Sequence, residues 1–292
     1  MLNKKKILVL IIAYNDEEFI LDVLKKTQKN LYKKKSEIIV INDNSKDKTF
    51  EQIYKFIKNN KKSSTKISLV ENPKNRGYGK NQKMGYLYSI VNSFDVVVMV
   101  HGDGQFGPEK LEEIIEPILK NKADAVLGSR MKKKNNALKG KMPIYKFLGN
   151  IFLTFIQNLI LRSNLSEFHT GYRAYSPKKL NRVPFIFNSN SFVFDTEILI
   201  QLIMNNFKIF EIPVKTTYST QISNLKVIPY GLSVLNAVIQ FKLCKLGLVK
   251  NNKYSKTKNN LSQKKKLIDN LEEGLKNGKK KIFNFDNSQK PN

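Results

Sequence analysis

Short apolar runs alternate with amphipathic segments through the first half of the chain. Such runs predict strands buried on both faces, and the segments between them have the spacing of helices. The predicted strands are 7–13, 37–41, 66–70, 94–100 and 125–127. The predicted helices are 16–30, 47–58 and 80–92. This alternation predicts an α/β fold with a mostly parallel sheet flanked by helices.

Polar residues directly follow three of the predicted strands. They are Tyr14-Asn15-Asp16, Asn42-Asp43-Asn44-Ser45 and His101-Gly102-Asp103-Gly104-Gln105. The carboxyl ends of parallel strands meet at one edge of a sheet, and ligands bind there. We therefore expect these three loops to line one site.

Asp103 is the residue in these loops best suited to a divalent cation. The glycines on either side let a ligand approach the backbone closely. Mg²⁺ and Mn²⁺ prefer oxygen ligands and commonly bind one or two carboxylates together with substrate phosphates. Gln105 offers a carbonyl oxygen on the same loop. The alternative reading of this loop is a structural β-turn built around Asp-Gly.

A second glycine loop, Asn75-Arg76-Gly77-Tyr78-Gly79, precedes the predicted helix 80–92. It is either an ordinary loop or a turn whose backbone amides face a phosphate. It lacks the spacing of a P-loop, and no GxGxxG motif follows the first strand. Nucleotide hydrolysis and dinucleotide oxidoreduction therefore lose support.

The pattern changes in the second half of the chain. Two long apolar segments occur at 143–161 and 227–249, and polar residues interrupt both. We expect neither to span a membrane alone, so each is either a buried core helix or a helix at a membrane surface. The tail 251–292 is basic, and we expect it to be loosely helical or disordered.

Composition narrows the functional class. The 52 basic and 24 acidic residues give a net charge of +28, which attracts nucleic acid, anionic lipid or a phosphorylated substrate. One cysteine and two histidines argue against a disulfide scaffold and against a zinc site built on Cys or His. The basic residues are spread along the chain, and no RNA-binding or helix-turn-helix motif occurs, so we predict no nucleic-acid partner.

Taken together, the motifs resemble the family 2 glycosyltransferases, most closely the dolichol- or polyprenyl-phosphate sugar transferases. The resemblance runs from residue 7 to about residue 218. It rests on IIAYNDEE (11–18), INDNSKDKT (41–49), NPKNRGYGKNQKMGY (72–86), HGDGQFGPE (101–109), GSR (128–130), GKMPIYKFLGN (140–150), EFHTGYRAYS (167–176) and FDTEI (194–198). It implies a GT-A fold, which we place at 1–225, followed by an amphipathic, membrane-surface helix at 226–250 and the tail at 251–292.

The resemblance also assigns a candidate site by position. Nucleotide-sugar contacts fall on Ala13, Tyr14, Asp16, Asp43, Arg76, Gly79, Gly102 and Asp103. Metal ligands fall on Asp103, Gln105 and His101. Acceptor or phosphate contacts fall on Arg130, His169, Arg173 and Glu197. Catalytic roles fall on Asp103, Glu167 and Arg173.

The implied activity is the transfer of a hexose, with inversion, from a UDP- or GDP-linked sugar with the help of Mg²⁺ or Mn²⁺. Two classes of acceptor stay open. A polyprenyl phosphate is already anionic and needs no strong base, whereas a glycan hydroxyl requires a carboxylate base, for which Glu167 and Asp195 are the candidates. The apolar segments favour the lipid phosphate.

Three positions depart from the family pattern. Ile12 replaces the usual proline, and Asn42 and His101 each replace an aspartate. His101 matters most, because loss of the first carboxylate of the metal-binding Asp-x-Asp is expected to weaken affinity for Mg²⁺. These departures motivate a rival hypothesis, a protein that binds sugar nucleotides or polyanions but has lost catalysis.

The charge and the apolar segments together predict where the protein lies in the cell. We expect a peripheral enzyme at the inner, cytoplasmic face of a membrane, held by an anionic lipid surface or by a membrane partner subunit. Each lysine near such a surface contributes about 1 kcal/mol, so a few lysines suffice.

Overall fold

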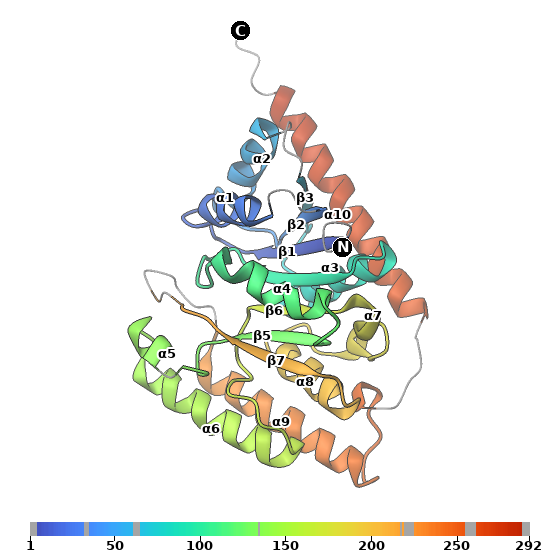
Figure 1. Ribbon diagram of the computed structural model, residues 1–292. Coiled ribbons are helices and arrows are strands. Elements are labelled where there is room, and N and C mark those ends of the chain that lie inside the picture. The colour runs from blue at the N-terminus through green and yellow to red at the C-terminus, as the bar shows by residue number, and fades with distance from the viewer. Residues whose placement is uncertain are drawn as a thin grey trace.

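The protein is described by a computed structural model that covers residues 5–31, 35–60, 65–133, 135–216, 218, 225–254 and 261–287. A seven-stranded sheet of order β3-β2-β1-β4-β6-β5-β7 forms its centre (Figure 1). Its strands are β1 (Ile7–Ala13), β2 (Ser36–Asn42), β3 (Lys66–Glu71), β4 (Val96–His101), β5 (Ala125–Ser129), β6 (Arg173–Tyr175) and β7 (Ile209–Pro213). Neighbouring strands are parallel except β6, which is antiparallel to β4 and β5. The predicted α/β fold with a mostly parallel sheet is confirmed.

Helices cover both faces of this sheet. The α-helices are α1 (Ile20–Asn30), α2 (Thr49–Asn59), α3 (Tyr78–Val91), α4 (Leu111–Leu119), α5 (Asn135–Lys139), α6 (Ile144–Leu161), α7 (Pro177–Leu180), α8 (Phe194–Met204), α9 (Val227–Lys245) and α10 (Leu261–Asn287). Side chains of β1 alternate between two cores: Val9 and Ile11 pack with α1, α2 and α4, whereas Leu8 and Leu10 pack in the core that contains α3, α8 and α9. A strand buried on both faces needs such a continuous apolar run.

Two elements differ from the sequence-based expectation. Helix α1 begins at Ile20 and not at Asp16, because the Asp16 carboxylate accepts a hydrogen bond from the backbone N–H of Tyr14 (3.0 Å) and holds a turn there. Strand β6 has only three residues, which is too short for an alternation of polar and apolar positions to be recognised.

Helix α6 turns polar residues toward the protein interior and apolar residues toward the outside. Asn150, Thr154 and Gln157 are buried, whereas Phe152 and Phe155 are 57% and 64% exposed. Both α6 and α9 are long and apolar enough to cross a membrane by length and composition, with a mean hydropathy of 1.4, although 22% of each is buried in the protein. The polar residues Asn150 and Gln157, which interrupt this apolar segment in the sequence, face inward in α6.

The C-terminal helix α10 crosses the edge of the sheet at β3 and packs beside α3 (Figure 1). Leu267 and Leu271 are buried, at 5% and 4% exposure, and join the core that contains α3 and α8. An unpaired edge strand invites association with other chains, and a covering helix prevents it. The domain boundaries at 225, 226 and 251 stay predictions, with α9 inside the second segment and α10 inside the third.

Candidate functional site

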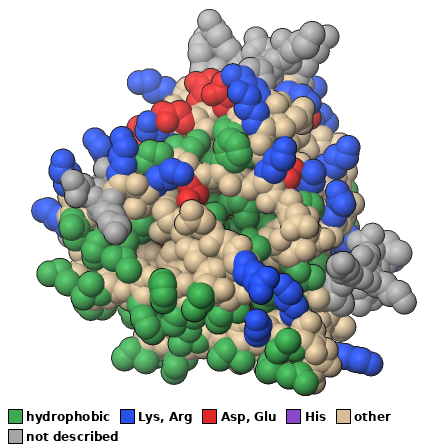
Figure 2. All heavy atoms as spheres, turned by 60° about the horizontal axis from the view of Figure 1, so that its bottom comes forward, with side chains coloured by type: hydrophobic (Ala, Val, Ile, Leu, Met, Phe, Trp, Pro, Cys, Tyr) green, Lys and Arg blue, Asp and Glu red, His purple; other side chains and the backbone are tan. Residues whose placement is uncertain are grey.

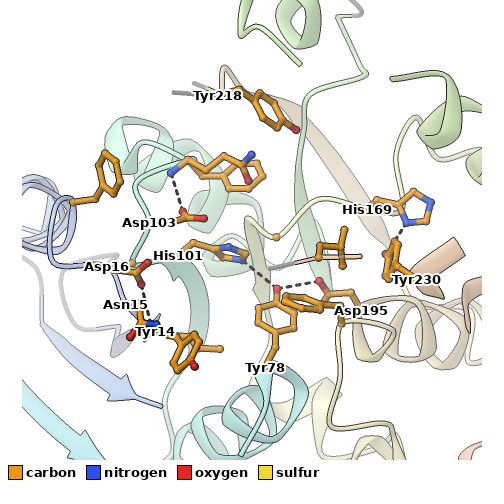
Figure 3. Close-up of a pocket in the computed structure, with 18 of the residues that line it drawn as sticks. Tyr14, Asn15, Asp16, Tyr78, His101, Asp103, His169, Asp195, Tyr218 and Tyr230 are labelled. Carbon is orange, nitrogen blue, oxygen red and sulfur yellow. Dashed lines mark hydrogen bonds between the residues drawn. The ribbon is translucent and has the colours of Figure 1, made fainter. Parts of the chain in front are cut away.

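A cavity of about 820 Å³ opens at the carboxyl ends of β1, β2 and β4 (Figure 3). The three polar loops that follow these strands meet there, as the parallel sheet requires. Helices α6 and α9 and the segment before β6 form the opposite wall. The predicted site residues that line the cavity are Tyr14, Asp16, Asp43, His101, Gly102, Asp103, Gln105, Arg130, His169 and the candidate base Asp195.

Two carboxylates, Asp16 and Asp103, face each other across the β1 and β4 loops. Burial, and then the negative charge of Asp103, raise the pKa of Asp16 to about 8. Oδ1 of Asp103 accepts the backbone N–H of Gln105 (2.9 Å). A Cβ on Gly102 would lie 2.5 Å from Oδ2 of Asp16, so only glycine lets the two loops approach this closely.

This pair is suited to a divalent cation that is completed by a ligand. Asp103 and Gln105 offer hard oxygen donors, and a cation between the loops would relieve the repulsion that Asp16 experiences. Across the part of the chain that the structure describes, His, Cys, Asp and Glu side chains form no cluster of three that would hold a metal alone. Substrate phosphates would therefore have to supply further ligands, as they commonly do for Mg²⁺.

Asp43 is held in place by the glycine loop that follows β3. Its Oδ1 accepts the backbone N–H of Arg76 (2.7 Å) and the side-chain amide of Asn72 (2.8 Å), and its Oδ2 accepts the N–H of Gly77 (3.0 Å). Gly77 has φ = +88°, and a Cβ there would meet the carbonyl oxygen of Asn190 at 2.7 Å. The loop therefore needs glycine at 77 to present its amides to Asp43.

His101 belongs to a hydrogen-bonded chain along the floor of the cavity (Figure 3). The Tyr78 hydroxyl donates to Oδ2 of Asp195 (3.0 Å) and lies 3.1 Å from Nε2 of His101. The hydroxyl has a single hydrogen, so Nε2 of His101 must donate to the Tyr78 oxygen. In the neutral ring this leaves the lone pair on Nδ1, which is the atom of His101 suited to ligate a cation.

Arg173 lies behind the wall of the cavity and not in it. The side chain is fully buried, and its guanidinium donates to the carbonyl oxygens of Thr170 (2.6 Å), Phe168 (2.7 Å) and Asp195 (2.8 Å). It also lies 3.6 Å from Oδ2 of Asp195. The guanidinium of Arg173 is therefore not exposed to make the phosphate contact expected from the sequence. It instead holds the segment before β6 against α8.

Glu167 and Arg130 form a second buried pair. Oε1 of Glu167 accepts Nε of Arg130 (2.7 Å) and the side-chain amide of Asn150 (2.9 Å), and Oε2 accepts the Arg130 N–H (2.7 Å). Burial alone would raise the pKa of Glu167, but the charge and hydrogen bonds of Arg130 hold that pKa below its ordinary value. Nη1 of Arg130 donates to the Tyr218 hydroxyl (2.6 Å) at the cavity surface.

His169 packs edge-on against Tyr230 of α9, and its Nδ1 lies 2.8 Å from the Tyr230 hydroxyl. Nε2 of His169 is buried with no protein partner. Burial lowers the pKa of His169 to about 3, so the ring is neutral near pH 7. It contributes a neutral polar group to the cavity and no positive charge.

The remaining predicted residues lie outside the cavity lining. Ala13 ends β1 and accepts the N–H of Asp43 through its carbonyl (2.9 Å), and Gly79 packs under the segment 189–191. Glu197 accepts a hydrogen bond from Lys253 (2.5 Å), and the Arg76 side chain reaches α10. The lining thus excludes Ala13, Arg76, Gly79, Glu167, Arg173 and Glu197.

Several lining residues were not predicted from the sequence. They are Tyr78, Lys146, Asn150, Tyr218 and Tyr230. Lys146 and Arg130 are the only Lys or Arg side chains in the described lining. A signal for the α6 residues was present, because polar positions 146, 150, 154 and 157 recur at helical spacing and mark one face of the helix.

The chain is similar to proteins of known class. A family model described as Glycosyl transferase family 2 matches residues 8–183. A UDP-N-acetylglucosamine–dolichyl-phosphate N-acetylglucosaminyltransferase of Methanococcus voltae is 29% identical over 227 residues, which is 74% of this chain and 87% of the relative. A dolichyl-phosphate beta-glucosyltransferase of Dictyostelium discoideum is 29% identical over 239 residues, which is 77% of this chain and 70% of the relative.

Among solved structures, the chain is similar to the glucosyl-3-phosphoglycerate synthase of Mycobacterium tuberculosis in complex with Mn²⁺, UDP and phosphoglyceric acid. The TM-score is 0.58, and the match covers 85% of this chain and 80% of the other. The sequences are 16% identical, so this likeness concerns the fold.

The lowered pKa of His169 should make the stability of the protein sensitive to acid. Its pKa is about 3 in the folded state and about 6.5 when unfolded. Below pH 6.5 the unfolded state therefore binds the extra proton, and the free energy of unfolding falls by about 1.4 kcal/mol for each pH unit down to about pH 3. We expect the free energy of unfolding, measured by urea titration at several pH values between pH 6 and pH 4, to fall less steeply with pH in His169→Gln, by this amount per pH unit. Equal slopes in parent and variant would mean that the imidazole takes up its proton in the folded protein.

Proposed function

The chain belongs to glycosyl transferase family 2 and is a glycosyltransferase with a GT-A fold, and we propose that it transfers a sugar from a nucleotide-diphosphate sugar to a polyprenyl phosphate. The printed activities of the two named relatives support this class of acceptor. The observation that carries the proposal is that both candidate base carboxylates are occupied by other side chains. Glu167 is paired with Arg130. Asp195 accepts hydrogen bonds from Tyr78 and Gln82 beside Arg173.

The donor half of the cavity is formed by the loops after β1, β2 and β4. We assign the nucleoside to Tyr14, Asp16 and Asp43, and the diphosphate to the loop of Asp103 and Gln105. The solved relative binds Mn²⁺ and UDP, and these two residues offer the oxygen donors that such a cation prefers. A cation held there would neutralise charge on the leaving diphosphate. Nδ1 of His101 is an additional ligand atom.

A hydroxyl acceptor would require a carboxylate base beside the acceptor. In the described lining, Asp195 is the only carboxylate outside the donor loops, and Glu167 lies outside the lining. Glu167 is paired with Arg130. Asp195 accepts hydrogen bonds from Tyr78 and from Gln82 (2.9 Å) and lies beside Arg173. A phosphate monoester is already anionic near pH 7 and needs no proton removed. This difference favours the lipid phosphate over a glycan hydroxyl.

The reaction that fits these groups is a single displacement. An oxygen of the lipid phosphate forms a bond to the anomeric carbon, and the bond from that carbon to the nucleoside diphosphate breaks with its electron pair leaving on the diphosphate. Attack opposite the leaving group gives inversion. Lys146, together with the Tyr218 hydroxyl that already accepts from Arg130, would hold the acceptor phosphate in line.

The acceptor half of the cavity opens toward helices α6 and α9. Figure 2 shows a broad apolar surface at this end of the molecule, bordered by lysines. Its exposed residues on α6 and α9 are Ile144, Tyr145, Leu148, Ile151, Phe152, Phe155, Leu159, Ile228, Leu232 and Ile239. We name this set the α6–α9 face. Residues on the inner sides of the same helices, Lys146, Asn150 and Tyr230 among them, line the cavity.

We propose that the α6–α9 face lies in the interface of a bilayer, with the helices parallel to the membrane plane. A continuous outward-facing apolar surface on two neighbouring helices is stabilised by contact with an apolar phase. Exposed lysines at 226, 242, 245 and 250 border the face, and the cytoplasmic leaflet is anionic. This supports peripheral binding at the cytoplasmic face, where a lipid phosphate would enter the cavity directly.

Asp103→Asn should weaken donor binding at least tenfold, because the variant loses the charge that holds the cation. In a thermal-shift screen with Mn²⁺ and either UDP- or GDP-sugars, the parent should be stabilised by its donor. The shift should vanish in Asp103→Asn and persist in Asp95→Asn, a carboxylate at the opposite end of β4. An equal thermal shift in all three proteins would contradict the proposed position of the cation at the Asp103 loop.

Lys146→Ala should raise KM for polyprenyl phosphate about tenfold or more, since a hydrogen bond to a charged group contributes about 1.5–3 kcal/mol. Lys146→Arg should retain most of the affinity, and the exposed Lys178→Ala should behave like the parent. Donor hydrolysis without acceptor should stay unchanged in all three variants. A KM unaffected by Lys146→Ala would place the acceptor phosphate elsewhere.

Carboxylates on the α6–α9 face should release the protein from membranes. Phe152→Asp combined with Phe155→Asp removes two side chains, each contributing about 1.5–3 kcal/mol when buried in an apolar phase. In vesicle flotation with anionic lipid, this variant should stay in solution, whereas Val91→Asp, an exposed apolar residue on α3, should float like the parent. Donor binding serves as the check on folding. Flotation of the double variant would contradict the proposed orientation.

A further inference from the structure

Arg76 connects the C-terminal helix to the donor half of the cavity. Its Nη1 donates to Oδ1 of Asn270 in α10 (2.7 Å), and its Nη2 lies 3.9 Å from the carboxylate of Glu273. Glu273 is 58% exposed, so its ion pair contributes little and the hydrogen bond to Asn270 is the stronger link. The Arg76 side chain is 14% exposed and points away from the cavity.

The backbone of the same residue supports the cavity. The N–H groups of Arg76 and Gly77 donate to the two carboxylate oxygens of Asp43, at 2.7 and 3.0 Å. Asp43 lines the cavity, where its orientation is set by these two amides and by Asn72. A displacement of Arg76 would therefore move the donors that orient Asp43.

Helix α10 is anchored firmly enough to act as a reference for this loop. Leu267 and Leu271 are buried in the core, and Gly274 packs so closely on β3 that a Cβ there would lie 2.5 Å from Val70. The hydrogen bond that links α10 to the loop, from Arg76 to Asn270, lies among several positive charges. Arg76 and Lys266 place positive charge beside Lys80, and burial, followed by these two charges, lowers the pKa of Lys80. The acceptor oxygen of Asn270 offsets some of that repulsion.

We propose that α10 is a positioning element for the donor site, and that Asn270 acts through Arg76 to hold the 75–77 loop on Asp43. The inference rests on the proposed function in one respect, the contact of Asp43 with the nucleoside. Asn270 and Arg76 are positioning residues and do not themselves touch the donor. The alternative is that α10 only covers the edge of the sheet at β3.

The two roles predict different behaviour of Asn270→Ala in the full-length, ligand-free protein. If Asn270 positions the loop, amide hydrogen exchange at Arg76 and Gly77 should become about threefold to tenfold faster, the effect of losing one hydrogen bond. Asn270→Asp keeps an acceptor and adds a negative charge among three cations, so it should exchange like the parent or more slowly. Glu272→Ala, an exposed residue of the same helix, is the matched control.

The effect of Asn270 on the donor site is tested by calorimetry, which measures the binding of UDP and GDP in the presence of Mn²⁺. In Asn270→Ala, the affinity for the nucleotide that the parent prefers should fall by the same threefold to tenfold. In Asn270→Asp, this affinity should return to that of the parent. The kcat at saturating donor should be unchanged in Asn270→Ala. Unchanged exchange and unchanged affinity would overturn the inference, as would exchange that rises equally along all of β3 and α10. If the parent binds neither nucleotide while exchange at Arg76 and Gly77 responds as expected, the proposed function fails and the positioning role of α10 stands.

Discussion

Two buried pairs of arginine and carboxylate determine the charge of the acceptor half of the cavity. Removing one partner of such a pair leaves an uncompensated charge in a poorly solvated place, so each pair persists as a unit. Arg130 with Glu167 joins the end of β5 to the segment before β6, and Arg173 with Asp195 joins β6 to α8. Both carboxylates are thereby occupied by other side chains, and Arg173 is fully buried whereas Arg130 still lines the cavity. This arrangement supports the proposed acceptor, an anion that needs no deprotonation.

The two halves of the cavity have opposite character for the same structural reason. Loops after parallel strands bring acidic and amide groups to the donor half, where Asp16, Asp43 and Asp103 suit a cation and a nucleoside. The acceptor half is built from α6, α9 and the segment before β6. There Lys146 and neutral polar groups stand at the boundary with the exposed α6–α9 face. The proposed acceptor, with a phosphate head and an apolar tail, would fit this change from polar to apolar surface.

Much of the fold and part of the site followed from the sequence. Strands such as 7–13 are recognisable because they are buried on both faces, and the loops after them meet because parallel strands share an edge. Side-chain direction was not predictable. Arg76 and Arg173 stand in motifs of the cavity loops, yet both turn away from it. Asn270, the partner of Arg76, lies 194 residues further along the chain, and no local pattern reveals such a contact.

Strand β6 is the one strand of the described sheet that runs antiparallel to its neighbours. It runs against β4 and β5, so its amino end, and not its carboxyl end, reaches the edge of the sheet where the cavity opens. The segment 167–171, which follows α6 and precedes β6, thereby reaches the cavity. A single reversed strand thus adds a wall to the cavity that the loops after the parallel strands do not supply.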